Sequence, residues 1–415
     1  MKTLLSTLAA SLCFTFSLSA QDDIRCATRE YMDQQIQKDP SLNKRLQEIE
    51  TNLQLTINSN KFLKTGASVI TIPVVVHVVY NATAENLSDA QVKSQIAVLN
   101  EDYRLLNADK KNTPSVFSSV AADAQIEFCL AKIDPQGNPT TGIIRKQTTM
   151  TSFALSDNGV KYTSMGGDDA WDATKYLNIW TCNLSGGILG YAQIPGLAAA
   201  TDGVAIKYYA FGYGGSAKKR FDKGRTATHE IGHWLGLIHI WGDANCGDDQ
   251  VADTPPQQTY NVGCPYFPKI SCAAGSDGDM FMNFMDYVDD SCMNIFTSGQ
   301  VTRMMGTLNG TRSTFKTATA CTGPTSVQTA KLTGNLSADI FPNPGTGLFN
   351  CKVEGLAASN CEIKITSLIG EFIAEEKESN NGSFILNLSQ HSNGIYVVRI
   401  ADGKSVLYKK IIVSK

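Results

Sequence analysis

The sequence predicts an α/β or α+β domain with a histidine-bearing helix, followed by a small all-β sandwich. Three observations lead to this prediction. A β-branched run, VITIPVVVHVVY, at 69–80 is typical of a buried strand. Helical and strand patterns alternate after it up to about residue 317. From 338 to 415 the pattern changes to short alternating strands between Asn and Gly turns.

Periodicity assigns the elements of the first domain, which we place at 63–317. We expect a helix at about 89–105 and another from about Thr226, with further strands at 126–131, 176–184 and 203–210. Residues 318–337 are small and polar, as in a linker. Residues 338–415 then suit an immunoglobulin-like sandwich, in which a Cys351–Cys361 bridge across a hairpin is one suggestion.

Length and charge limit the classes of function. A chain of 415 residues with 42% hydrophobic content is long enough for two or three cores. Thirty-six Lys and Arg against thirty-nine Asp and Glu give a net charge of −3, so no basic field favours nucleic acid as a partner.

The N-terminus predicts export. Residues 1–20 place one Lys before a short apolar stretch ending in small residues, the layout of a signal peptide cleaved near Ala20. A membrane anchor fits less well because Ser and Thr break the stretch, and no later segment offers the ~18 apolar residues of a spanning helix. We expect a secreted protein with no transmembrane segment. Ten of its eleven cysteines follow the signal peptide, and an oxidising compartment favours bridges between them.

Residues 21–62 are polar and Gln-rich and lack the apolar density of a core, so we interpret them as a pro-segment. Their apolar residues follow a helical spacing: Tyr31, Ile36, Leu42, Leu46 and Ile49.

Three of the five histidines fall within the segment HEIGHWLGLIH, as His229, His233 and His239. Residues four apart share a helix face, so the first two can present imidazoles to one ion, with Glu230 beside them. Gly236 can end the helix in a left-handed conformation and bring the third histidine to the same ion. Three imidazoles favour zinc and leave a fourth position for a water that Glu230 can deprotonate. This pattern predicts hydrolysis of a polarised carbonyl, such as a peptide bond. The isolated histidines, His77 and His391, are better explained by packing.

These residues carry a resemblance. HExxHxxGxxH followed by NFMDYVDD resembles the metzincin metalloproteases, and GRTATHEIGHWLGLIHIWGD, LGYAQIPG and DTPPQ are similar to their pappalysin family, over about 69–315. The resemblance implies an α+β, metzincin-like catalytic domain, in which a mixed twisted sheet carries the active-site helix. It implies His229, His233 and His239 as zinc ligands and Glu230 as general base. It also implies Met285 as the floor beneath the metal, and it makes Tyr287 a hydrogen-bond donor to the reacting carbonyl.

Four cysteines surround this motif, and sequence alone permits three pairings among them. The resemblance implies Cys246–Cys272 and Cys264–Cys292. The pairing of the other cysteines stays open: Cys129, Cys182, Cys321, Cys351 and Cys361.

The loop GDDQVAD offers Asp248, Asp249 and Asp253 as oxygen ligands for calcium, which pappalysin relatives bind here. A solvated acidic loop is the alternative. The segment LSGGILGYAQIPG resembles the rim strand along which extended substrates pair. Relatives prefer a basic residue just after the scissile bond, but 303–321 contains no acid, so we do not carry that preference over.

Cys26 in RCATREYM stands where similar zymogens carry Cys-Gly-Thr, with Ala27 in place of Gly. Its thiolate could fill the fourth zinc position and keep the enzyme latent. The alternative is a disulfide from Cys26 to another cysteine such as Cys321.

The C-terminal segments IFPNPGTGLFN, NGIYVVRI and KKIIVSK resemble the type A sorting domain of the type IX secretion system. A glycan-binding sandwich is the alternative. The complete prediction is a secreted zinc endopeptidase made as a latent zymogen, which acts on protein or peptide substrates. The rival functions are an adhesion or glycan-binding protein with an inactive metzincin-like domain, and a zinc amidase.

Overall fold

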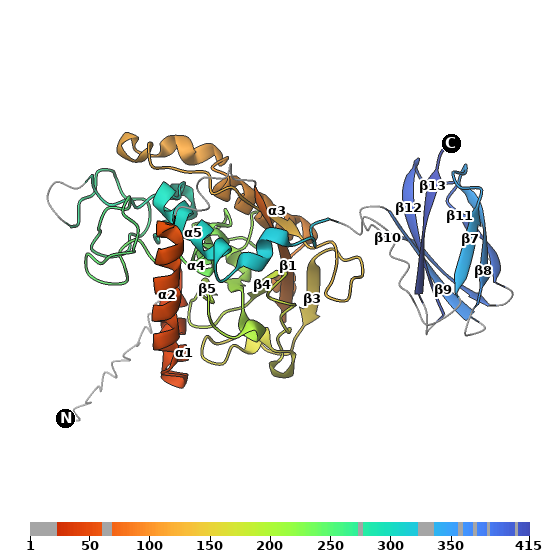
Figure 1. Ribbon diagram of the computed structural model, residues 1–415, viewed down its shortest axis with the longest axis horizontal. Coiled ribbons are helices and arrows are strands. Elements are labelled where there is room, and N and C mark those ends of the chain that lie inside the picture. Colours follow the sequence, from red (N-terminus) through yellow and green to blue (C-terminus); the bar gives the residue numbers. More distant parts are fainter. Residues whose placement is uncertain are drawn as a thin grey trace, which may run out of the picture.

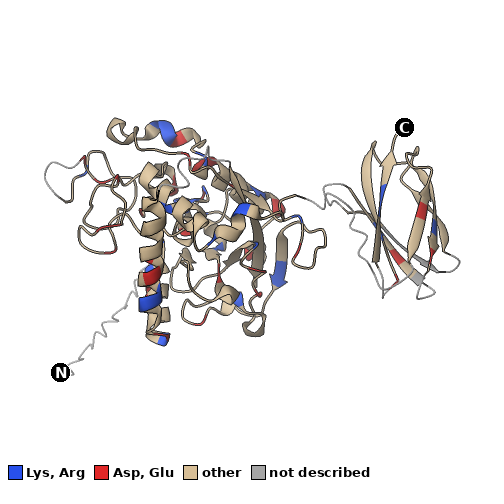
Figure 2. Ribbon diagram, viewed as in Figure 1, with Lys and Arg blue, Asp and Glu red and all other residues tan. Residues whose placement is uncertain are grey.

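The structure is a computed structural model that describes residues 23–59, 69–272, 277–322, 336–355, 360–367, 372–379, 382–402 and 406–415. The predicted signal peptide and its cleavage site lie outside these residues. Figure 1 shows an N-terminal unit with a sheet and helices, and a C-terminal unit of strands. Acidic and basic residues are interspersed along the ribbon in Figure 2, in keeping with the small net charge.

The sheet of the first unit is centred on β1 (Ile70–Tyr80), the predicted β-branched strand. β1 pairs in parallel with β2 (Ile126–Leu130) along its first half and with β3 (Ile143–Gln147) along its second. On its other side β4 (Leu177–Cys182) and β6 (Val204–Lys207) follow in parallel, and β5 (Gly190–Ala192) closes the edge antiparallel to β6. The mixed sheet confirms the predicted α+β class.

Side chains of β1 alternate between two faces of this sheet, as a strand buried on both sides requires. Val74, Val76 and Val78 belong to the main core, together with apolar residues of α3 (Asp89–Tyr103) and α4 (Arg225–Trp234). Buried His77 contacts Asp168 and Asn178 through its two ring nitrogens, at 2.7 and 3.1 Å, which is a hydrogen-bonding role in the core.

A further helix, α5 (Ser298–Asn309), has no counterpart among the predicted elements. Its first turn carries a capping box, in which the Thr297 hydroxyl accepts from the Gln300 N–H and the Gln300 side chain accepts from the Thr297 N–H. The Thr-x-x-Gln spacing was therefore an available start signal.

Residues 21–62, predicted as a pro-segment and called so below, form two helices, α1 (Thr28–Lys38) and α2 (Leu42–Asn58), in line with their helical spacing. Tyr31 and Met32 are buried in a cluster with Trp180 and Tyr191 of the sheet. The segment is therefore packed into the first unit rather than solvated along its length.

The C-terminal unit is all-β, as predicted, and consists of two antiparallel sheets. One has the order β10–β9–β12–β13 and the other β11–β8–β7. The strands span β7 (Ser337–Phe341), β8 (Leu348–Glu354), β9 (Asn360–Ser367), β10 (Phe372–Ser379), β11 (Ser383–Asn387), β12 (Gly394–Ala401) and β13 (Val406–Val413).

The suggested Cys351–Cys361 bridge is wrong. Cys351 is a buried free thiol on β8 of one sheet, whereas Cys361 lies on β9 of the other, so the two are not neighbours across a hairpin. The expectation that exported cysteines are bridged also fails at Cys182, a free thiol buried in β4.

A disulfide joins Cys129 of β2 to Cys321, inside the stretch predicted as a linker. The alternative Cys26–Cys321 bridge is therefore wrong, because Cys321 is already paired and Cys26 is a free thiol. Within the described ranges, no helix has the length and apolarity needed to span a bilayer.

Candidate active site

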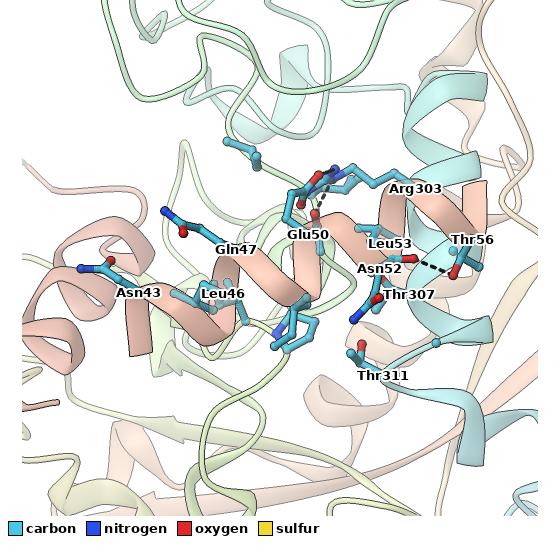
Figure 3. A pocket seen from close by; sticks show the side chains of 18 residues that line it. Asn43, Leu46, Gln47, Glu50, Asn52, Leu53, Thr56, Arg303, Thr307 and Thr311 are labelled. Carbon is cyan, nitrogen blue, oxygen red and sulfur yellow. Dashed lines mark hydrogen bonds and ion pairs between the residues drawn. The ribbon is translucent and has the colours of Figure 1, made fainter. Parts of the chain in front are cut away.

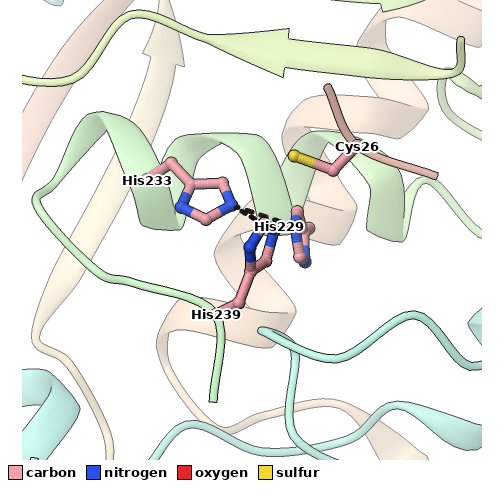
Figure 4. A group of neighbouring side chains, drawn as sticks. All are labelled: Cys26, His229, His233 and His239. Atoms are coloured by element: carbon pink, nitrogen blue, oxygen red, sulfur yellow. Dashed lines mark hydrogen bonds between the residues drawn. The ribbon is translucent and has the colours of Figure 1, made fainter. Parts of the chain in front are cut away.

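The three histidines of the HEIGHWLGLIH segment converge at the end of α4. His229 and His233 lie one turn apart on the helix, and His239 approaches them from the chain that follows it (Figure 4). The Nε2 atom of His233 lies 3.1 Å from that of His229 and 3.0 Å from that of His239. All three side chains are buried.

Each histidine is oriented by an acceptor at its other ring nitrogen. Nδ1 of His229 donates to the Phe284 carbonyl at 2.7 Å, and Nδ1 of His233 donates to that of Leu237 at 2.9 Å. Nδ1 of His239 lies 2.5 Å from a carboxylate oxygen of Asp243. Because these acceptors fix the proton on Nδ1, the three Nε2 atoms face one another as lone pairs.

The surroundings keep the first two histidines neutral. Burial, with His233 and His239 close by, lowers the pKa of His229 far below its usual value, and burial lowers the pKa of His233 to about 3. Converging lone pairs of neutral imidazoles repel one another unless a cation lies between them, so this donor set suits a divalent metal such as zinc.

Gly236 makes the turn that brings the third histidine round. Its φ of +90° is a left-handed conformation, and a Cβ there would lie 2.6 Å from the Thr307 hydroxyl oxygen. The Leu237 N–H donates back to the Gly232 carbonyl, which closes the helix end.

Glu230 projects beside the histidines, as the helical spacing requires. Its Oε1 atom is buried without a partner, while Oε2 accepts from the Thr28 hydroxyl at 2.9 Å. Burial raises the pKa of Glu230 to about 8. Gly190 of the edge strand leaves room for this side chain, because a Cβ there would lie 2.9 Å from Oε1.

Met285, which the resemblance implied as the floor beneath the metal, packs against α4 in the structure. It is fully buried, and a Cβ at Gly232 would come within 2.5 Å of its sulfur, so the glycine of HEIGH permits the contact. The Tyr287 hydroxyl lies 3.1 Å from Nε2 of His239 and donates to the Cys26 carbonyl at 3.2 Å. The turn therefore supports the histidines from below and presents a phenol at the same point.

Cys26 of the pro-segment points at the histidines (Figure 4). Its sulfur and one nitrogen of each histidine lie within 4.8 Å of one another, and among the described residues they form the one such cluster. Burial, with the charge of Glu230, raises the thiol pKa, so a thiolate here requires a nearby cation. Ala27 takes an ordinary φ of −120°, so the place of the family's glycine needs no left-handed residue.

The pro-segment also follows the edge strand. The Ala27 N–H donates to the Gly190 carbonyl at 2.9 Å, and the Ala192 N–H donates to the Thr28 hydroxyl at 2.8 Å. Ile24 pairs with residues just before the strand. The segment read as a rim strand thus binds an extended chain by its backbone.

The sequence analysis did not identify Asp290 as a residue of the site. Arg25 lies close enough to His229 to influence its pKa, and it reaches the Asp290 carboxylate at 2.6 Å. The side chains of Arg25 and Asp290 are 3% and 0% exposed. The other oxygen of Asp290 accepts from the backbone N–H groups of Lys223 and Arg225. A buried acid that takes a basic side chain is therefore present, outside the 303–321 stretch where we sought one. The acid run VDD after the methionine turn was the available signal.

The three acids of the GDDQVAD loop are not brought together as one ligand set. Asp253 accepts from Thr297, Ser298 and the Gly299 N–H, so it caps the start of α5. Asp248 bonds within its own loop to Gln250. Asp249 accepts from Thr254, but its Oδ2 is buried without a partner, and burial raises the pKa of this carboxyl to about 7.

Two disulfides hold the loops around the site. They join Cys246 to Cys272 and Cys264 to Cys292, the pairing that the resemblance implied. A buried carboxylate, Asp286, adds four hydrogen bonds from Asn261, Gln257 and the Tyr287 N–H, which fix the turn.

Comparison with known proteins gives matches for both units. The profile of the family described as pregnancy-associated plasma protein-A matches residues 162–309, and that of the secretion system C-terminal sorting domain matches 339–414. An extracellular metalloprotease of Pyricularia oryzae is 32% identical over 310 residues, which cover 73% of this chain and 94% of that protein. One of Verticillium alfalfae is 34% identical over 252 residues, covering 58% and 76%.

Solved structures agree. Mature mirolysin of Tannerella forsythia in complex with a cleaved peptide is 54% identical with a TM-score of 0.59, covering 60% of this chain and 96% of that one. A promirolysin variant from the same organism is 49% identical with a TM-score of 0.65, covering 70% and 97%. The chain therefore belongs to the pappalysin family and is a secreted metalloendopeptidase with a C-terminal secretion-sorting domain.

Proposed function

We propose that the enzyme is a zinc endopeptidase with His229, His233 and His239 as ligands and Glu230 as general base. The observation that carries this proposal is the convergence of three Nε2 atoms, with that of His233 at 3.1 and 3.0 Å from those of His229 and His239, and with an acceptor at Nδ1 of each ring. When bound, zinc supplies Lewis-acid chemistry: it polarises the substrate carbonyl and lowers the pKa of water.

The chain's own residues supply the remaining steps. The Gly190 carbonyl and the Ala192 N–H, which now bind the pro-segment, hold the substrate backbone beside the histidines. Glu230 takes the proton of the attacking water at its unpartnered oxygen and passes it to the departing amine. Tyr287 donates its hydroxyl to the oxyanion that develops on the scissile carbonyl.

Replacing Glu230 tests this assignment. The Glu230→Ala protein, freed of its pro-segment by an added protease, should keep about one zinc per chain and its melting temperature but lose peptide cleavage by at least ~10³-fold. Glu101→Ala, which removes an exposed Glu of α3, is the matched control and should stay active. Near-normal turnover in Glu230→Ala would reject the general-base role.

We further propose that Asp290 binds a basic substrate residue just after the scissile bond. Arg25 now fills this pocket, and the charge-assisted bond it makes to a buried carboxylate is of the stronger kind. Asp290→Asn should lower the ratio of kcat/KM between an Arg peptide and its Gln counterpart by about 10²-fold. Asp289→Asn removes the neighbouring acid, which pairs with exposed Arg220, and should leave the ratio unchanged. If the Arg to Gln ratio of kcat/KM is unaltered in Asp290→Asn, then Asp290 does not select substrates by their charge.

The same proposal extends to latency, calcium and export. Cys26 holds the fourth zinc position in the zymogen, and its nearness to the three histidines supports this role. Asp249, with its unpartnered buried oxygen, is the centre of a calcium site in the 246–254 loop, with Asp248 beside it. The sorting domain directs the protein to the type IX secretion machinery.

A further inference from the structure

We call the region beside β5 that residues 24–28 occupy the cleft. Helix α2 of the pro-segment covers one end of it, and a cavity of about 590 Å³ lies against this helix. One wall is α2 itself. The other is made by Ile194 and Pro195 after the edge strand, the turn at 236–238, and α5 (Figure 3). The cavity therefore lies between the part of the chain expected to be removed and the part that remains.

This end of the cleft is opposite the Asp290 pocket. Along the edge strand, Ile24 pairs before Gly190 and Thr28 reaches Ala192, and the chain then continues to Ile194 at the cavity. If a residue after the scissile bond occupies the Asp290 pocket, as proposed above, residues before the bond extend toward the cavity.

An ion pair between a buried arginine and a partly exposed glutamate crosses this interface. Nη1 and Nη2 of Arg303 on α5 reach the two carboxylate oxygens of Glu50 at 2.8 and 2.6 Å (Figure 3). Nε of Arg303 donates to the Gly236 carbonyl at 2.7 Å, so the turn of the zinc motif holds the guanidinium in place. The Arg303 side chain is 4% exposed, whereas that of Glu50 is 36% exposed.

Aliphatic side chains of α2 pack closely against glycine residues of the same surface. A Cβ at Gly306 would lie 2.6 Å from Cδ1 of Leu53, and one at Gly196 would lie 2.2 Å from Cδ1 of Ile49. Both contacts therefore depend on glycine in the part that remains. The surface is shaped for branched apolar groups beside one carboxylate.

When α2 is removed, the Arg303 guanidinium loses Glu50 but stays held by the Gly236 carbonyl. Glu50 is the one carboxylate paired with Arg303 among the described residues. Asp249 interacts electrostatically with Arg303, but its carboxylate is bonded to Thr254. A buried cation without a counter-ion is costly, and a bidentate carboxylate satisfies both Nη groups.

We propose that Arg303 is a specificity-determining residue of the mature enzyme, which binds an acidic side chain of the substrate before the scissile bond. An aliphatic substrate residue next to that acid occupies the surface that Ile49 and Leu53 contact in this structure. The pro-segment thus fills this subsite with Glu50 until it is removed. This inference rests on the proposed function, since it needs a peptidase whose pro-segment is released.

Matched peptides test it. Every peptide carries Arg just after the scissile bond. Before the bond it carries one Glu–Leu pair, whose position differs by one residue from one peptide to the next. A second set has Gln–Leu in place of Glu–Leu. The enzyme is expressed as the full chain and then freed of its pro-segment. At one or two adjacent positions, its kcat/KM for the Glu peptide should be about tenfold above that for the Gln peptide.

Variants then assign the preference. Arg303→Gln should reduce the Glu to Gln ratio to about one, and Arg303→Lys, which keeps the charge but not the paired contact, should leave a smaller preference. Lys316→Gln removes an exposed positive charge just after α5 and should keep the wild-type ratio. The ratio cancels any general loss of activity in a poorly folded variant.

Several results would overturn the inference. These are equal rates for Glu and Gln at every position, a Glu preference that survives Arg303→Gln, or a 42–58 fragment that stays bound after processing. Failure of the proposed function looks different, because the zinc-loaded enzyme would then cleave none of the peptides.

Discussion

At the scale of single residues, the position of Tyr287 gives the most direct prediction. Its hydroxyl lies 3.1 Å from Nε2 of His239 and donates to the Cys26 carbonyl. Tyr287→Phe removes one donor to the developing oxyanion, so kcat of the processed enzyme should fall by about 10² while zinc content stays the same. An unchanged kcat would show that the phenol only packs on the histidines. Tyr260→Phe alters an exposed neighbouring ring and serves as the control.

The sequence was informative at this scale where one rigid element fixes the spacing. His229, Glu230 and His233 lie on a single helix, so four-residue periodicity places them together. Asp243 contacts His239 only four residues before it, but outside a helix, so no periodicity predicts the pair. The VDD run could mark Asp290 as a candidate, but no local pattern pairs it with Arg25 of a distant segment. Resemblance supplied Met285 and Tyr287.

At the scale of elements, the 246–254 loop carries the calcium prediction. The partnerless, buried Oδ2 of Asp249 and the neighbouring charge of Asp248 favour a cation, and an ion bound to the native loop stabilises the fold. Adding calcium to calcium-depleted, zinc-loaded protein should therefore raise the melting temperature by about 5 °C.

Two substitutions separate calcium binding from loop packing. Asp249→Asn should abolish the calcium-dependent rise. Asp253→Asn weakens the start of α5 and should lower the melting temperature equally with and without calcium. Identical melting of the wild type in both conditions would leave the loop a solvated acidic turn.

Element prediction succeeded where composition was strong and failed where pairing decides the structure. The β-branched run of β1 was sufficient for a buried strand. β3, with the sequence IIRKQ, has a weak pattern and is defined by its parallel register along the second half of β1. Likewise, Cys321 lies in a stretch with the composition of a linker but is tied to β2 by a disulfide.

At the scale of the whole molecule, the latency that we propose rests on several contacts between residues 25–50 and the rest of the first unit. Cys26 faces the histidines, Arg25 fills the Asp290 pocket, Thr28 engages Glu230, and Glu50 pairs with Arg303. Because zinc–thiolate bonding is one of several contacts, its loss should loosen the segment without releasing it at once.

Cys26→Ala should therefore leave a folded zymogen that processes itself about tenfold faster than the wild type. Gel electrophoresis and a peptide-cleavage assay at successive times measure the rate of processing. Cys351→Ala removes a buried free thiol of β8 in the C-terminal unit and should process at the wild-type rate. Combining Cys26→Ala with Arg25→Ala should accelerate processing further, since the second change empties the Asp290 pocket. If Cys26→Ala alone processes at the wild-type rate while Arg25→Ala is faster, then the basic pocket, rather than the thiolate, maintains latency.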